Sequence, residues 1–203
     1  MFREIVIPKN NEEEFIEIAS KLGIKKLYFL YDFDEYMQNQ KPKAFDFDVE
    51  IGFIVNQKNI NKAVKQTELL VVKSSDKDRF FIESKKIKLV YGLEETYKKD
   101  YLHQRASGLN HVICEIARKN NVTIGFAYSI LFNKDEYERA VLMGRMMQNI
   151  KLCQKYKVKT LIGSFSEKPF ELRAPHDLKS LFVMLGMNQI KPKNSLTNSR
   201  ESC

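Results

Sequence analysis

The order of predicted elements along the chain indicates an α/β barrel. Short apolar runs typical of strands alternate about seven times with stretches that have helical periodicity or helix-capping residues. Such alternation implies parallel strands joined by crossover helices, and a closed or nearly closed barrel fits it better than an open sheet. The chain has 203 residues, fewer than the ~250 typical of such barrels, so we expect a shortened or irregular TIM-like barrel. We assign residues 1–190 to this single domain and residues 191–203 to a polar, disordered tail.

The first half of the chain provides most of the predicted strands. An amphipathic helix follows Asn10 or Asn11, either of which can cap it, and it ends at Gly23. The polar segment 31–44 shows no clear element. The strand-like runs cover residues 4–7, 25–30, 47–55, 69–72 and 87–91, with a weak helical stretch within 56–65 and a short one at 76–83.

The second half contains the strongest helix signal. Apolar residues recur at helical spacing from Leu109 to Ala117, and Asn120-Asn121 ends this helix. Pro175 fits the first turn of the last helix, which Gly186 stops. Strands are predicted at 122–128 and 160–163, and further helices at 135–156 and 177–185.

The charge of the chain is concentrated in its second half. The sequence has 34 Lys and Arg against 26 Asp and Glu, a net charge of +8. The first hundred residues are neutral, with 18 residues of each sign, so residues 101–203 carry the whole excess. Such an imbalance indicates a polyanionic partner for the C-terminal half, with a basic solvated surface as the alternative.

Several classes of protein are excluded by the sequence. No stretch approaches the ~18 consecutive apolar residues of a membrane helix. The first residues turn acidic after one short apolar run, which is unlike a signal peptide. The 3 cysteines are far apart and odd in number, which argues against a disulfide framework and for a reducing, cytoplasmic location. Without a CxxC pair or a Cys/His ladder, a structural zinc site is not expected.

One candidate binding segment precedes the strongest helix. It brings Arg105, Ser107 and Asn110 to one helix start, where exposed N–H groups can bind anions. Gly108 would permit a close approach of the backbone. The alternative is a capped helix whose glycine serves a packing contact.

Two further regions contribute candidate phosphate-binding residues. Ser164 directly follows a strand, and Arg173 precedes the last helix. The long helix carries Arg139, Arg145 and Lys151, which can track a phosphate backbone. In each region the alternative is an ordinary solvated or ion-paired surface. We expect Gly144, in the middle of that helix, to serve close packing.

Enzyme motifs are absent from the sequence. There is no GxSxG, GxxxxGK[ST], HExxH or GxGxxG pattern. The three histidines, His103, His111 and His176, lack the spacing of metal ligands. We therefore assign no catalytic residue and no metal ligand to this chain.

Four blocks of sequence stand out when taken in order: residues 103–112 (HQRASGLNHV), 122–129 (VTIGFAYS), 144–153 (GRMMQNIKLC) and 171–178 (ELRAPHDL). Together they resemble ribonuclease P protein component 3, the archaeal counterpart of the eukaryotic thirty-kilodalton subunit. The first hundred residues match this family more loosely, mainly in their alternation of strand and helix.

The resemblance implies a TIM-like barrel related to the polymerase-and-histidinol-phosphatase superfamily. It also implies a protein subunit of ribonuclease P, the RNA-based endonuclease that removes the 5′ leader of precursor tRNA. In that family the RNA holds the Mg²⁺ ions, and the protein binds the catalytic domain of the RNA together with component 2 and other protein components. The chain would then contact precursor tRNA only indirectly. Relatives commonly carry an Asp in a short first strand, whereas this chain has Phe2-Arg3-Glu4 there.

Two other functions remain open at this point. The first is a metal-dependent phosphoesterase on the same barrel, with His103, His111, His176 and Asp32 as conceivable ligands. The second is a scaffold that only holds component 2. An RNA-binding subunit would instead depend on Arg105, Ser107, Asn110, Arg139, Arg145, Lys151, Ser164 and Arg173.

Overall fold

The chain folds as a parallel barrel of seven strands. The computed structural model describes residues 3–39, 45–95, 99–100 and 105–187. Every neighbouring pair of strands is parallel, and their order in the sheet is their order in the sequence. This confirms the predicted fold class. The strands are β1 (Arg3–Val6), β2 (Lys26–Asp32), β3 (Val49–Ile54), β4 (Leu70–Lys73), β5 (Leu89–Tyr91), β6 (Thr123–Ala127) and β7 (Thr160–Gly163).

The barrel closes where the chain just after β7 meets β1. The Phe165 N–H donates to the Ile5 carbonyl at 2.8 Å, and the Ile7 N–H donates to the Ser166 carbonyl at 2.9 Å. An isolated parallel bridge joins Val6 to Ser166. The carboxyl of Glu4 accepts the N–H groups of Ile5 and Ser164 at the same seam. A buried side chain thus completes the barrel where strand pairing ends.

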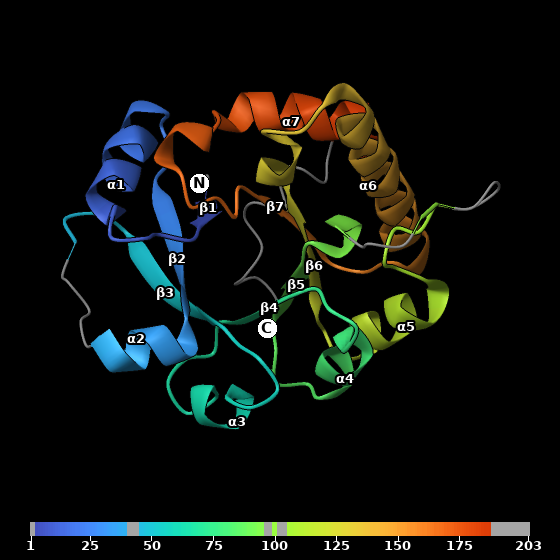
Figure 1. The fold of residues 1–203 in the computed structure, drawn as a ribbon, viewed down its shortest axis with the longest axis horizontal. Coiled ribbons are helices and arrows are strands. Elements are labelled where there is room, and N and C mark those ends of the chain that lie inside the picture. The colour runs from blue at the N-terminus through green and yellow to red at the C-terminus, as the bar shows by residue number, and fades with distance from the viewer. Residues whose placement is uncertain (1–2, 40–44, 96–98, 101–104, 188–203) are drawn as a thin grey trace.

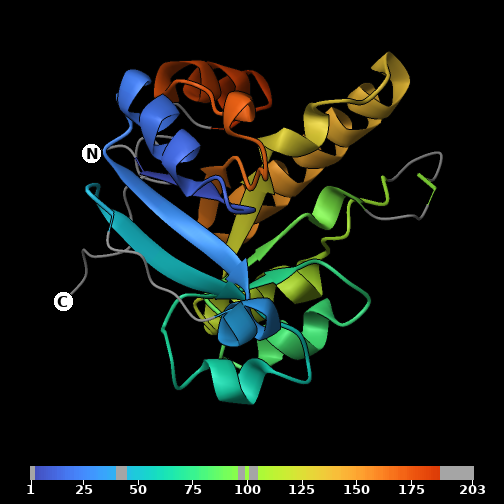
Figure 2. The same cartoon turned by 60° about the vertical axis from the view of Figure 1, so that its left-hand side comes forward.

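Helices surround the strands in sequence order. Figure 1 shows this ring, and Figure 2 shows α1, α6 and α7 on one side of the barrel and α2 to α5 on the other. The helices are α1 (Glu12–Lys21), α2 (Phe33–Asn39), α3 (Ile60–Ala63), α4 (Asp78–Glu83), α5 (His111–Lys119), α6 (Glu136–Tyr156) and α7 (Pro175–Met184), with 3₁₀ turns η1 (Leu93–Glu95), η2 (Tyr128–Leu131) and η3 (Pro169–Glu171).

Helix α2 lies where the sequence predicts no clear element. The Asp32 carboxylate starts it by accepting the N–H groups of Asp34 and Glu35 at 2.9 and 3.2 Å. Phe33 and Tyr36 then pack on the Phe53 ring, with centroids 5.3 and 4.9 Å apart. This tertiary contact holds a helix whose own sequence pattern is weak. The tail at 191–203 lies outside the described residues.

The inside of the barrel is filled by apolar side chains. The rings of Tyr91 and Phe165 stack there with centroids 4.3 Å apart. A Cβ added at Gly125 would stand 3.1 Å from the Phe165 ring, so this strand glycine makes room for it. A packed interior directs the search for a functional site to the two ends of the barrel and to its helices.

Two further expectations concern cysteines and membranes. Cys114 and Cys153 are free, buried thiols that contact each other between α5 and α6. The described part of the chain therefore contains no disulfide, although the fold brings these two distant cysteines together.

No helix among the described residues is long and apolar enough to cross a membrane.

Candidate nucleic-acid interface

A buried polar cluster joins α6 to the segment that follows β5. Arg145 lies on α6 and is 7% exposed. Its Nε donates to Asp100 Oδ1 at 2.9 Å, and its Nη1 donates to the Glu94 carbonyl at 3.0 Å. Burial acts to raise the pKa of Asp100, but the Ala106 N–H and the Arg145 guanidinium lower it below its usual range. The arginine is thus an internal ion-pair partner.

Glu94 and Asn149 continue this cluster in the interior. The Asn149 Nδ2 donates to Glu94 Oε1 and to the Ser107 carbonyl, at 2.7 and 2.8 Å. Burial raises the pKa of Glu94 to about 7, against the effect of the bond from Asn149. Among the described residues, neither Glu94 Oε2 nor Asn149 Oδ1 has a hydrogen-bond partner. A protonated Glu94 carboxyl has an O–H group that can act as a hydrogen-bond donor in this acceptor-rich cluster. This favours the neutral form of Glu94.

The candidate segment before α5 packs along the same helix. Gln148 donates to the Arg105 carbonyl and accepts from the Arg105 N–H, and it also donates to Ser107 Oγ at 2.8 Å. A Cβ at Gly144 would overlap the Arg105 guanidinium, which confirms the close packing expected there. Gly108 has φ +78° and lies against the Leu93 carbonyl, as its predicted close approach requires.

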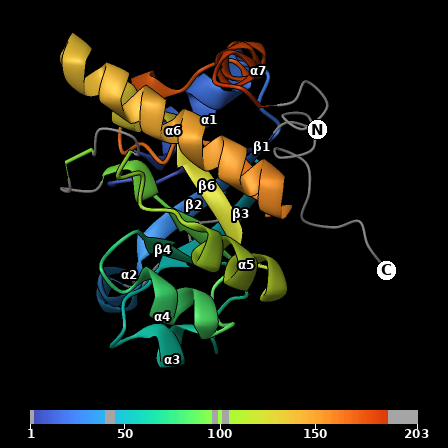
Figure 3. The same cartoon turned by 90° about the vertical axis from the view of Figure 1, so that its right-hand side faces the viewer.

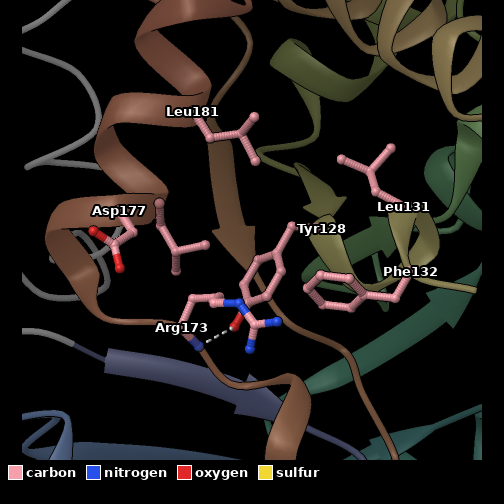
Figure 4. A pocket seen from close by; sticks show the side chains of 7 residues that line it. Tyr128, Leu131, Phe132, Arg173, Asp177 and Leu181 are labelled. Atoms are coloured by element: carbon pink, nitrogen blue, oxygen red, sulfur yellow. Dashed lines mark hydrogen bonds between the residues drawn. The ribbon is translucent and has the colours of Figure 1, made fainter. Parts of the chain in front are cut away.

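The carboxyl ends of the strands, here called the mouth, hold a second polar group of residues. The Arg173 guanidinium lies 4.7 Å from the centroid of Phe132, and its Nη1 donates to the carbonyls of Phe170 and Leu172. The Arg173 N–H donates to the Tyr128 hydroxyl at 3.2 Å. Figure 4 shows these residues around a pocket of about 190 Å³, which is lined by Tyr128, Leu131, Phe132, Arg173, Asp177, Leu178 and Leu181.

Glu4 lies beneath this pocket, against Tyr128 and Ser164. Burial raises the pKa of the Glu4 carboxyl from 4.5 to about 8, although hydrogen bonds from Ser164, Ile5 and Tyr128 oppose the shift. The Ser164 Oγ accepts the Ser166 N–H at 3.1 Å. Ser164 is fully buried, so this serine serves the closure of the barrel.

The eight residues predicted to bind RNA do not form one surface. Three of them are buried and make hydrogen bonds inside the protein: Arg145, Ser107 and Ser164. Asn110 caps α5 by accepting the Ile113 N–H at 2.9 Å. Arg139 donates to the carbonyls of Leu131 and Lys134. The five that remain exposed are Arg105, Asn110, Arg139, Lys151 and Arg173.

The residues considered as metal ligands are dispersed. Asp32 starts α2, His111 begins α5, and the His176 ring pairs with Asp177 at 3.7 Å. His103 lies outside the described residues. No group of three His, Cys, Asp or Glu side chains in the described part of the chain could hold a metal ion.

Two pairs of segments distant in sequence meet in these clusters. Residues 105–107 pack on 144–149, and Tyr128 meets Arg173. The filled interior and the seven parallel strands define a TIM-like α/β-barrel protein. Polar side chains of this barrel hold the segment before α5 against α6 and the segment before α7 against the mouth.

Comparison with known proteins identifies the family. The model of the family described as RNase P subunit p30 matches residues 96–203. The chain belongs to this family. The matched region includes both polar clusters except for Glu4 and Glu94.

Curated relatives and a solved structure agree with this assignment. Ribonuclease P protein component 3 of Thermococcus kodakarensis is 37% identical over 89 residues, 44% of this chain and 40% of that protein. The Methanocaldococcus jannaschii protein of the same name is 26% identical over 189 residues, 89% of this chain and 82% of the relative. A chain in a cryo-EM structure of archaeal ribonuclease P with mature tRNA has a TM-score of 0.72 at 22% identity, and the match covers 95% of this chain and 86% of that one. The structural likeness shows the shared barrel.

Proposed function

We propose that this protein is a subunit of ribonuclease P, the RNA-based endonuclease that removes the 5′ leader of precursor tRNA. The observation that carries the proposal is the family match over residues 96–203, the segment that also carries the excess of positive charge. The relatives named ribonuclease P protein component 3 support it. The neighbouring fold in an archaeal ribonuclease P particle is consistent with the same role.

In this role the chain contributes binding, and the RNA contributes the chemistry. We assign no catalytic residue and no bound cofactor to the protein, and the Mg²⁺ ions of the reaction to the RNA. Its partners are the ribonuclease P RNA, component 2 and other protein components, with precursor tRNA contacted indirectly. We place this assembly in the cytoplasm of an archaeon. The predicted residues that remain exposed, Arg105, Asn110, Arg139, Lys151 and Arg173, are proposed contacts to the RNA.

The proposed mechanism is a linkage between protein binding and RNA folding. Cationic side chains neutralise phosphates that crowd together when the catalytic domain of the RNA becomes compact. Because the protein and Mg²⁺ both favour the compact state, binding of one raises the apparent affinity for the other. The chain therefore lowers the Mg²⁺ concentration that the holoenzyme needs.

Reconstitution tests this function. Ribonuclease P RNA is assayed for leader removal at limiting Mg²⁺, alone, with this chain, with component 2, and with both proteins. We expect both proteins together to restore cleavage at Mg²⁺ concentrations where the RNA alone is inactive. Absence of any effect of the chain in the complete mixture would refute the proposal.

A parallel assay addresses the phosphoesterase alternative. The purified chain is incubated with Mn²⁺ or Zn²⁺ and a generic phosphodiester, without RNA. The proposal predicts no turnover above the metal blank. Robust turnover would favour the metal-dependent enzyme, of whose conceivable ligands Asp32, His111 and His176 lie on different elements of the described structure.

A further inference from the structure

The amino-terminal end of the barrel carries a group of cations from three adjacent turns. The turns at 84–88, 118–122 and 155–159 lead into β5, β6 and β7, which are neighbours in the sheet. Because all strands are parallel, these turns lie together at the end opposite the mouth. Figure 3 shows α5 beside the C-terminal half of α6 there. The three turns contain no acidic residue and eight exposed cations, here called the basic end: Lys85, Lys86, Lys88, Arg118, Lys119, Lys155, Lys157 and Lys159.

The backbone holds these turns in similar shapes. Lys85, Asn121 and Lys157 each adopt a left-handed conformation, with φ of 58°, 56° and 55°. After α5 and α6, the N–H groups of Val122 and Val158 close the helix ends by bonding back to Ala117 and Cys153 at 2.9 Å. Val122 and Val158 are buried, as is Ile87 in the first turn. Hydrogen-bonded helix ends and buried apolar residues therefore anchor the turns from which these cations extend into solvent.

No carboxylate of the described residues neutralises the charges of the basic end. None of the eight forms an ion pair with any residue that the structure describes. Lys86 Nζ donates to the neutral Asn61 side chain, and Lys155 Nζ lies 5.5 Å from the Tyr156 ring centroid. The acidic residues next to these turns in the sequence are Glu83, which pairs with Arg79 on α4, and Glu115 on α5, and Glu68 precedes the neighbouring strand β4.

The mouth has the opposite charge on the same three strands. The described residues of 92–105, 128–139 and 164–177 include nine acids, one of which is the buried Glu94, and six cations. Mouth-side cations also pair with carboxylates, as Arg105 does with Asp100 at 3.6 Å and Lys134 with Glu138 at 3.8 Å. A polyanion approaching this barrel is therefore attracted more strongly to the basic end than to the mouth, where Arg105, Arg139 and Arg173 remain proposed RNA contacts.

We propose that the basic end is the main docking surface for the sugar–phosphate backbone of a helical RNA segment. This inference rests on the proposed function and locates its largest electrostatic contact. Adjacent strands lie about 4.8 Å apart, so Lys88, just before β5, and Lys159, just before β7, stand roughly 10 Å apart and can reach different phosphates of one backbone. The large exposed apolar side chains of the described residues lie outside the three turns. Contacts here are thus made to phosphates and not by stacking on unpaired bases.

Matched charge reversals test this surface. The basic-end variant combines Lys86→Glu, Lys88→Glu, Lys119→Glu and Lys159→Glu, and it leaves the left-handed positions intact. The control variant makes the same change in charge at four exposed lysines on mouth-side loops: Lys9, Lys58, Lys77 and Lys168. Both full-length proteins are checked by thermal unfolding and for binding of component 2. Their affinity for ribonuclease P RNA is then measured over a range of salt concentrations.

We expect the basic-end variant to bind RNA about 100-fold more weakly or worse. The slope of log affinity against log salt concentration should become about 4 less steep, because four phosphate contacts are lost. The control variant should lose less than about tenfold. An unlabelled RNA duplex should compete better than a single strand of equal length. If the control loses more affinity than a folded basic-end variant, this location is wrong while the proposed function stands. If the unaltered chain neither binds the RNA nor supports leader removal, the proposed function itself fails.

Discussion

Replacement of Arg145 by alanine is expected to lower the free energy of unfolding by about 3 kcal/mol or more. The substitution removes the buried guanidinium and leaves the Glu94 carbonyl without the donor that satisfies it. Asp100 loses its shortest ion pair and keeps only the Ala106 N–H and the longer contact to Arg105. Loss of one partner of a largely buried ion pair is costly because the groups left behind are only partly solvated. Chemical denaturation monitored by circular dichroism, at a pH above 7, measures the loss.

Arg105→Ala is the matched control for this substitution. Arg105 pairs with the same Asp100, but its side chain is 48% exposed and the closest approach is 3.6 Å. Exposed pairs contribute roughly 0–1 kcal/mol, so this variant should unfold close to the unaltered chain. An R145A protein with unchanged stability and weakened RNA binding would contradict the structural role of Arg145 and return it to the RNA-binding surface.

The stability of the chain is expected to increase as the pH falls from about 8 toward 5. The pKa of Glu4 is about 8 in the folded protein against 4.5 when exposed, so the folded state binds an additional proton between these values. Its contribution is complete below 4.5 and is lost as the pH rises through 8, at roughly 1.4 kcal/mol per pH unit. Glu94, with a pKa of about 7, adds to the same trend between 4.5 and 7.

Glu4→Gln isolates the first of these groups. The amide oxygen can still accept the N–H groups of Ser164 and Ile5, and the side chain no longer titrates. The variant should have a flatter dependence of unfolding free energy on pH, with the greatest gain over the unaltered chain above pH 8. A parallel decline of both proteins with rising pH would show that Glu4 does not cause it.

The sequence is sufficient to predict most of the barrel. Buried strands such as β4 and the amphipathic helix α5 have patterns that local periodicity reveals. Helix α2 escapes prediction because its stability comes from Phe53, a residue on another strand. A closed or nearly closed barrel is predicted, but the contacts that close the β1–β7 seam are not, because Glu4 and Ser164 are distant in sequence.

The candidate site is harder to predict because residue type does not reveal exposure. Arg145 and Lys151 are both cations on one helix, yet the first faces the interior and the second faces solvent. Asp100, which neutralises the first, precedes it by 45 residues. The positive charge of residues 101–203 indicates only five of the eight cations of the basic end, because Lys85, Lys86 and Lys88 lie in the neutral first half. The location of the basic end follows only from the order of β5, β6 and β7, which brings three lysine-bearing turns together.

The salt dependence of RNA affinity tests the central claim that cationic side chains of this chain hold a ribozyme by its phosphates. The dissociation constant for ribonuclease P RNA is measured from about 50 to about 200 mM monovalent salt at constant Mg²⁺. If RNA phosphates contact most of the cations of the basic end, log affinity should fall linearly with log salt concentration. The affinity itself should decrease by about a thousandfold over this range. An affinity that stays constant over this range would contradict the claim.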